Sequence, residues 1–177
     1  MFEKARAEFN NNQYGAAKTY FLQAAELNGL DVAGTLEAAE KCMAAEEIDK
    51  ASEMFLTVAQ AVPVETSALT GMARAALFLG MTGEAAEYLR AAMQVNPDLA
   101  LGHTLQGIVA EQQEKMEQAS KSFQRGAELG RNQFLCQFNN GRFHTLIGSL
   151  EIGIPALLRA TELEPDNYDA HYAMGMA

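Results

Sequence analysis

Small residues recur along this chain at a spacing of 34 positions, and large apolar residues recur beside them at the same spacing. The first small column holds Ala5, Ala39, Ala73, Gly107, Gly141 and Gly175, and the second holds Ala17, Ala51, Ala85, Ala119 and Gly153. The large column holds Phe21, Phe55, Leu89, Phe123 and Leu157. A period of this length indicates a chain built from stacked copies of one small unit.

Each row of 34 residues contains two stretches of helical period, which predicts a helix, a turn, a second helix and another turn. The second helix is expected to end before the proline column, because proline cannot continue the helical hydrogen-bond ladder. That column holds Pro63, Pro97 and Pro165, with Gly29 and Arg131 in the other two rows. Small side chains are favoured where two helix axes approach to about 8 Å, so the small columns predict helix crossings.

The fifth row departs from this pattern at Gly153 and Pro155, which fall where its second helix should begin. Proline is tolerated in a first helical turn, where the amide groups have no partners within the helix. We therefore expect this helix to start late, and a local hinge is the alternative.

A single hairpin cannot bury its apolar face alone, so the rows are expected to stack. The sequence predicts an all-α fold and a single domain over residues 1–177. Its hairpin units are 1–31, 32–65, 66–99, 100–133 and 134–167, with a partial sixth unit at 168–177. The last unit leaves Tyr172, Met174 and Met176 without a covering helix, which predicts either a fragment of a longer chain or an end that docks against another subunit.

The pattern resembles the tetratricopeptide repeat (TPR) family over essentially the whole chain. The resemblance rests on the small residues at Ala5, Ala17 and Ala24, the aromatic at Phe21, and the closing proline, each with its equivalents in 34-residue units. It implies a right-handed superhelical solenoid of helix-turn-helix hairpins, in which the first helices line a concave groove that receives a protein segment.

Charge and composition narrow the classes of partner. The formal net charge is -10, which disfavours nucleic acid as a ligand because a phosphate backbone would be repelled. The longest uncharged run, Leu99–Ala110, is too short to cross a bilayer, so no membrane insertion is expected. The chain opens without the apolar stretch of a signal peptide, which weakly favours a cytoplasmic location and leaves the compartment open.

The sequence lacks the motifs of common enzymes and metal sites. It contains no phosphate-binding loop, no dinucleotide fingerprint, no zinc-protease motif and no nucleophile elbow. Cys42 and Cys136 have no metal-binding spacing, and His103, His144 and His171 lie in separate units, where packing or surface roles are expected. We therefore predict a non-enzymatic protein without a metal or cofactor.

The resemblance places one stripe of each first helix on the concave face, and counting at helical spacing from the small column gives the candidate peptide-binding residues. They are Arg6, Leu36, Glu40, Met43, Thr70, Arg74, Leu77, Phe78, Thr104, Ile108, Glu111, Phe138 and Arg142. Their apolar members supply contact area, and packing against a neighbouring helix is an equally good interpretation of them.

Arg6, Arg74 and Arg142 occupy one column of this stripe in the first, third and fifth units. Because guanidinium groups bind carboxylates in a planar, bidentate way, we expect these arginines to bind acidic groups of a partner. The alternative is internal pairing, for which Glu40 is the nearest candidate. The carboxylate clamp of the family's heat-shock co-chaperones is not reproduced, since Phe2, Glu40 and Thr70 stand where its lysines and asparagine would be sought.

Three functions are compatible with these observations. The first is a protein-interaction scaffold that binds a peptide or protein segment in its concave groove. The second is an assembly platform that self-associates through the C-terminal end into a homo-oligomer. The third is the substrate-recruiting region of a larger enzyme.

Overall fold

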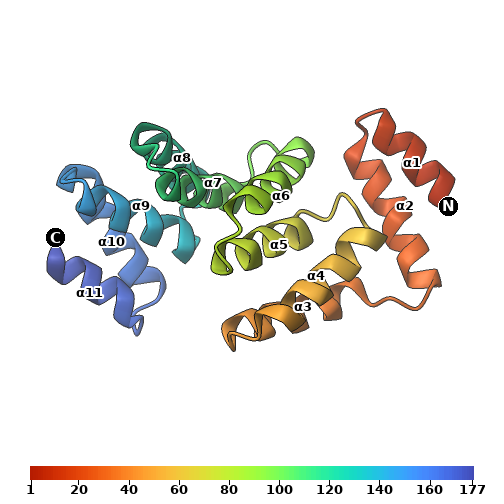
Figure 1. The fold of residues 1–177 in the computed structure, drawn as a ribbon, viewed down its shortest axis with the longest axis horizontal. Coiled ribbons are helices and arrows are strands. Elements are labelled where there is room, and N and C mark those ends of the chain that lie inside the picture. Colours follow the sequence, from red (N-terminus) through yellow and green to blue (C-terminus); the bar gives the residue numbers. More distant parts are fainter. The chain divides into compact units, whose positions relative to one another are not determined.

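The computed structural model describes residues 1–177 and contains eleven α-helices and no strand (Figure 1). The chain forms two compact units, unit 1 over Met1–Pro97 and unit 2 over Asp98–Ala177. Unit 1 contains α1 (Phe2–Asn10), α2 (Tyr14–Leu27), α3 (Val32–Ala44), α4 (Ile48–Ala61), α5 (Thr66–Phe78) and α6 (Thr82–Val95). Unit 2 contains α7 (Ala100–Gln112), α8 (Met116–Leu129), α9 (Phe134–Leu146), α10 (Leu150–Leu163) and α11 (Tyr168–Met176).

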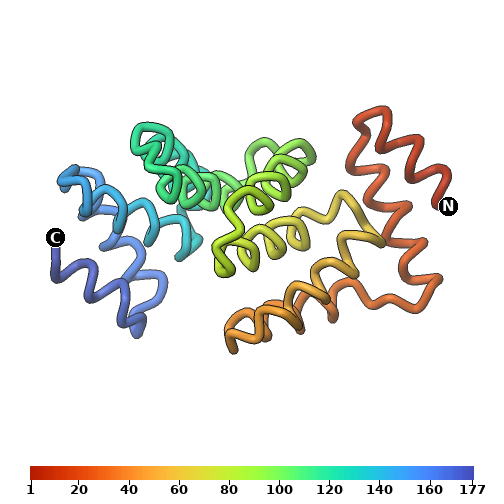
Figure 2. The backbone as a smooth tube through the Cα atoms, in the orientation of Figure 1, coloured from red at the N-terminus to blue at the C-terminus, as the bar shows by residue number.

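Successive helices within each unit pair as antiparallel hairpins, which can be followed along the tube in Figure 2. The predicted all-α fold of helix-turn-helix hairpins is confirmed. Whether the hairpins form one continuous array over residues 1–177 stays a prediction. None of the helices is long and apolar enough to cross a membrane.

The turn inside every hairpin contains one residue with left-handed backbone geometry. These residues recur every 34 positions: Asn12 (φ 59°), Glu46 (φ 58°), Gly80 (φ 74°), Glu114 (φ 60°) and Gly148 (φ 79°). A left-handed residue reverses the chain directly after a helix, and glycine adopts this geometry without steric cost. The glutamates at two of these positions therefore hold a conformation that L residues seldom adopt.

The small columns lie where the helices cross, as the sequence predicts. Ala5, Ala17, Ala39, Ala51, Ala73 and Ala85 are completely buried in unit 1, and Ala119 is completely buried in unit 2. The large column fills the space beside these contacts, with Phe55, Phe123 and Leu157 fully buried.

The expected late start of the second helix in the fifth unit is wrong. Helix α10 begins at Leu150, in register with Met116 of α8, and Pro155 lies inside it. The amides of Ile152 and Gly153 already donate to the carbonyl of Ser149, at 3.1 and 3.0 Å. The fixed φ of proline suits a helix, so the cost of Pro155 is confined to the one hydrogen bond that it cannot donate.

Unit 2 contains a buried polar cluster around His144, which is 1% exposed. The Nδ1 atom of His144 lies 2.9 Å from the backbone oxygen of Asn140, an acceptor, so Nδ1 carries the proton and donates. The Nε2 atom then accepts from Ser120 Oγ at 2.9 Å and from Gln124 Nε2 at 3.1 Å. His144 is thus a packing residue with both ring nitrogens satisfied.

Candidate functional site

The first helices of unit 1 bring Arg74 and Glu40 together. Arg74 lies on α5 and Glu40 at the equivalent position of α3, and Arg74 NH1 donates to the two carboxylate oxygens at 2.7 and 2.9 Å. The side chain of Arg74 is 23% exposed and that of Glu40 is 49% exposed. The internal pairing considered from the sequence is therefore present, and it leaves the guanidinium accessible from one side.

The first helices of unit 2 form a second pair of the same kind. Arg142 on α9 donates through NH1 and NH2 to the two carboxylate oxygens of Glu111 on α7, at 3.1 and 2.6 Å. This is the bidentate geometry that arginine favours with carboxylates. Glu111 lies about one helical turn beyond the position equivalent to Glu40, which Ile108 occupies.

Arg6, the third arginine of this column, has no carboxylate partner. It lies exposed on α1, with its guanidinium carbon 5.5 Å from the centroid of the Phe2 ring. This arrangement is a cation–π contact on the same helix. The three arginines share one column of the sequence, but their partners in the structure differ.

The apolar candidates divide between packing and exposure. Leu36 and Met43 are partly buried against the cluster of Ala39, Ala51 and Phe55, and Ile108 packs against the cluster around Phe123. Leu77 is partly exposed, and Phe78 is 59% exposed. The Phe138 ring stacks on that of Phe134, with centroids 5.4 Å apart. Phe134 was not among the candidates, although its spacing of four residues from Phe138 on a helix is the signal that could have found it.

Thr70 and Thr104 are buried and present no side-chain surface to a ligand. The Thr70 hydroxyl donates to the carbonyl of Thr66 at 2.8 Å, and the Thr104 hydroxyl donates to that of Ala100 at 3.1 Å. Threonine hydroxyls commonly bond back to a carbonyl of the preceding helical turn, which satisfies them within the protein.

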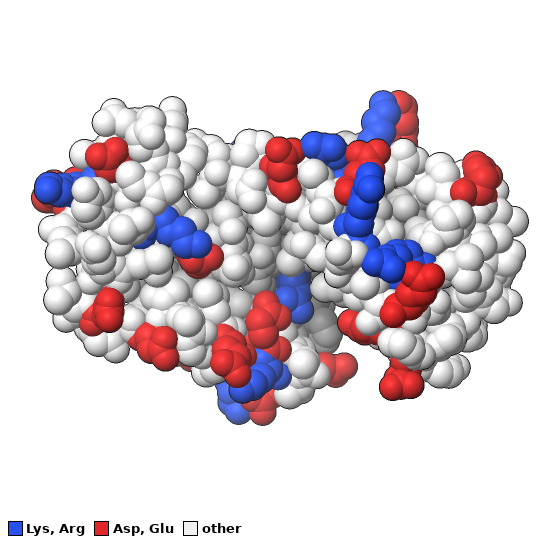
Figure 3. Space-filling model, turned by 180° about the vertical axis from the view of Figure 1, so that it is seen from behind, with Lys and Arg blue, Asp and Glu red and all other residues white.

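Basic side chains elsewhere on the surface also lie against acidic ones. On the face drawn in Figure 3, blue and red groups lie next to one another. The pairs include Lys121 with Glu117 at 2.6 Å and Arg125 with Asp98 at 2.8 Å. The hydrogen bond from Lys121 and the attraction of its charge lower the pKa of Glu117. Paired cations of this kind present no dense positive patch.

Comparison with protein families gives two matches to tetratricopeptide repeat models. One model matches residues 70–133 and another matches residues 1–29. Together the matched segments cover just over half of the chain. No curated protein sequence matches the chain significantly.

Solved structures of TPR proteins share the fold. The crystal structure of TTC0263, a TPR protein of Thermus thermophilus, has a TM-score of 0.71 and 19% identity, over 98% of this chain and 95% of its own. YrrB, described as a TPR protein with an unusual peptide-binding site, has a TM-score of 0.55 and 22% identity, over 88% of this chain and 80% of its own. The first TPR of Spaghetti (RPAP3), bound to the HSP90 peptide SRMEEVD, has a TM-score of 0.56 and 20% identity, over 66% of this chain and 93% of its own. At these identities the similarity concerns the fold.

Proposed function

Because this chain belongs to the tetratricopeptide repeat family, we propose that it is a non-enzymatic protein-interaction module that binds an acidic segment of a partner protein along its first helices. The observation that carries this proposal is the repeated arginine–glutamate pair, Arg74 with Glu40 in unit 1 and Arg142 with Glu111 in unit 2. Each pair holds a guanidinium in a defined orientation on a first helix while leaving part of it open to solvent.

The internal glutamates do not prevent these arginines from binding a ligand. Ion pairs at a protein surface contribute only about 0 to 1 kcal/mol, so exchanging the half-exposed Glu40 for another carboxylate costs little. A partner carboxylate can take the place of Glu40, which then returns to water. Glu111 is only 20% exposed, so replacing it costs more. The apolar side chains of Leu77 and Phe78 beside Arg74 supply contact area in unit 1. The acidic peptide bound by the RPAP3 repeat provides a precedent within the family.

The proposal is tested by titrating a capped tetraglutamate peptide into the protein and into single variants by calorimetry. Arg74→Glu should weaken binding by about tenfold or more, since it replaces attraction by repulsion. Glu40→Gln should strengthen binding severalfold, because it removes the internal competitor without changing shape. If Arg74 binds the ligand, the two variants should have opposite effects on affinity. If Arg74 only holds the helices together, both variants break the same ion pair and should have the same effect. Unchanged affinity in both variants would contradict the proposal.

A second candidate function is self-association through α11. Tyr168 and Tyr172 stack at 6.1 Å on this helix and are 76% and 59% exposed, and Met176 is 68% exposed. Exposed aromatic and methionine side chains are typical of association surfaces. Light scattering over a range of protein concentrations tests this function: the mass should rise with concentration and should do so less in Tyr172→Glu.

A further inference from the structure

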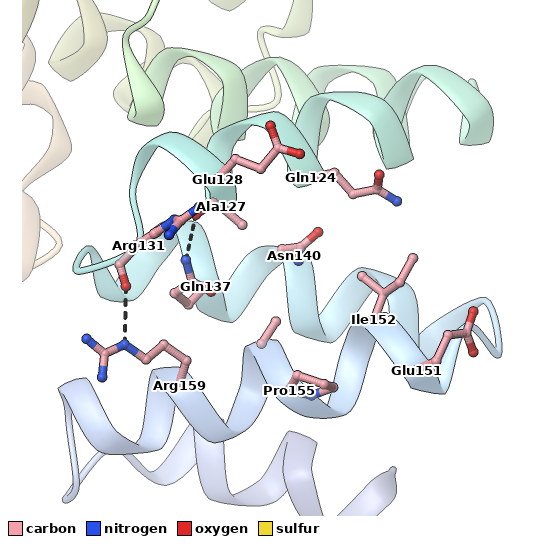
Figure 4. A pocket seen from close by; sticks show the side chains of 11 residues that line it. Gln124, Ala127, Glu128, Arg131, Gln137, Asn140, Glu151, Ile152, Pro155 and Arg159 are labelled. Atoms are coloured by element: carbon pink, nitrogen blue, oxygen red, sulfur yellow. Dashed lines mark hydrogen bonds between the residues drawn. The ribbon is translucent and has the colours of Figure 1, made fainter.

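Unit 2 contains a cavity of about 570 Å³ among α8, α9 and α10 that none of the functions above uses (Figure 4). Its walls are the second helices α8 and α10, and its floor is formed by Gln137 and Asn140 of α9. The cavity is open to solvent along one side rather than enclosed. The lining shares no residue with the candidate peptide-binding set on the first helices.

The floor of the cavity contains an unsatisfied amide. Asn140 is 95% buried, since its exposed fraction is 5%, and its Oδ1 atom has no hydrogen-bond partner. The neighbouring Gln137 is satisfied, because its Nε2 donates to the carbonyls of Ala127 and Gly130 at 2.8 and 3.2 Å. A buried acceptor without a partner is unfavourable, and rotation of the amide about χ2 would turn Oδ1 into the cavity, where a ligand donor can bond to it.

The two ends of the cavity carry opposite charges. In Figure 4, Arg131 lies at one end and Glu151 at the other, with Asn140 between them. Neither Arg131 nor Glu151 has an ion-pair partner, whereas Arg159, beside Arg131, is already bonded to Glu162 and Asn132, each through a guanidinium nitrogen. Glu128 also lines the cavity but is paired with Arg125, so the side-chain charges of Arg131 and Glu151 are the available ones.

Glu151 defines the other end of the cavity, on the same helix as Pro155, which also lines it. Its side-chain carboxylate is an acceptor only, so it favours a cationic donor at this end.

The length of the cavity limits what fits. Glu151 and Arg159 both line it and are eight residues apart on α10, which corresponds to about 12 Å. An extended peptide advances about 3.3 Å per residue, so about four residues cover this distance. A primary amide such as that of Asn140 carries both a donor and an acceptor, which match the C=O and N–H of a peptide group.

We infer that this cavity is a second protein-binding site, which takes an extended segment with an acidic side chain at the Arg131 end, a peptide group at Asn140 and a basic side chain at the Glu151 end. The walls contributed by Ile152, Pro155 and Ala156 contact the aliphatic part of the segment. The site shares α9 with the proposed arginine site but none of its residues, and it does not rest on that proposal.

The probe is a capped peptide with glutamate and lysine four positions apart and valines between them, because valine favours the extended conformation. It is prepared in both orders of the two charged residues, since charge fixes the ends but not the chain direction. Nuclear magnetic resonance of the whole chain follows the Asn140 side-chain amide and the Ile152 methyl groups during titration to about 5 mM, which covers the millimolar dissociation constants expected of weak contacts.

At least one order of the mixed-charge peptide should shift both signals in a saturable way, and peptides with two glutamates or two lysines should bind about tenfold more weakly. Ala156→Tyr should abolish the shifts by filling the cavity, and Glu151→Gln, a surface variant that keeps the shape, should weaken binding by itself. Arg74→Glu should leave binding unchanged. The inference is overturned if no peptide shifts Asn140, or if like-charged peptides shift Asn140 with equal affinity. It is also overturned if Ala156→Tyr retains its fold and Asn140 still shifts, or if the shifts lie at Arg142 and Leu146 instead.

Discussion

The third hairpin, α5–α6 in unit 1, and the fifth, α9–α10 in unit 2, use the same helix register with different interiors. At the helix crossing, unit 1 has Ala73 and Ala85, whereas unit 2 has Gly141 and Gly153 at the equivalent positions. In unit 1, Met72 and Tyr88 pack with the Phe55 cluster, whereas the equivalent residues of unit 2 are Asn140 and Ala156, which line the cavity. The repeat thus fixes where the helices cross, while neighbouring columns decide whether the space beside them is filled.

The two crossings also differ in how closely the helices approach. A methyl group on Gly141 would lie 2.8 Å from the Leu157 amide nitrogen, and one on Gly153 would lie 2.7 Å from that of Thr145. Backbone atoms cannot move aside as a side chain can. The helices at the glycine crossing therefore approach more closely than alanine would allow, although both crossings belong to the same columns.

The largest expected effect is that of Gly141→Ala, which installs the residue of unit 1. It should lower the free energy of unfolding by about 2 to 3 kcal/mol, because the added methyl group overpacks a crossing of two backbones. Urea denaturation measures the change. Gly83→Ala is the matched control, since nothing lies within 4 Å of a methyl group there and alanine stabilises a helix by up to about 1 kcal/mol. An equal response of both variants would show that the added methyl group meets no close contact at the Gly141 crossing.

The next effect concerns the polar interior of unit 2. His144→Leu should lower the free energy of unfolding by about 1 to 3 kcal/mol, because Gln124 and Ser120 lose the buried acceptor to which they donate. Ser120→Ala removes one of these bonds and should cost less. In unit 1 the equivalent of His144 is Ala76, and no such cluster exists at that position to disturb. A stabilising His144→Leu would mean that the cluster is dispensable for the fold.

A smaller difference is expected between the two thiols. Burial raises the pKa of Cys136 in unit 2, whereas Cys42 in unit 1 is partly exposed. Because the thiolate is the reactive form, and a raised pKa leaves less of it at any pH below that value, Cys136 should react with a thiol reagent at least about tenfold more slowly than Cys42 at about pH 8. Mass spectrometry of the labelled peptides over time measures both rates. Equal rates in native protein would contradict the burial of Cys136.

The smallest effect concerns the hairpin turns. Glu114→Gly should raise the free energy of unfolding by about 0.5 to 1 kcal/mol, because glycine relieves the left-handed geometry that Gly80 and Gly148 already accommodate. Glu117→Gly, on the following helix, is a control that should destabilise instead. Thermal denaturation of both variants checks the sign, and destabilisation by Glu114→Gly would show that its side chain does more than occupy the turn.

The sequence predicted the helices, their pairing and the small columns, because these depend on a spacing that is visible in one dimension. It placed Arg6, Arg74 and Arg142 in one column, and it left open whether each binds a glutamate of the chain or a ligand. Arg142 pairs with Glu111, which lies one helical turn beyond the position equivalent to Glu40 on the neighbouring helix. The 34-residue period does not predict a contact between positions that are offset in this way. The cavity forms because Asn140 and Ala156 face the same space from two helices. Residues that line a cavity need not be large and apolar, so the hydrophobic pattern of the sequence does not reveal them.

The arginine–glutamate pairs also have a mechanical side. Arg74 joins α5 to α3, and Arg142 joins α9 to α7, so each pair ties one hairpin to the hairpin before it. A ligand carboxylate that binds the guanidinium therefore breaks this ion pair between the hairpins. Ligand binding would then loosen the contact between consecutive hairpins, and the rate of amide hydrogen exchange in α3 and α7 would rise. A ligand that only covered the surface would lower that rate in the same segments.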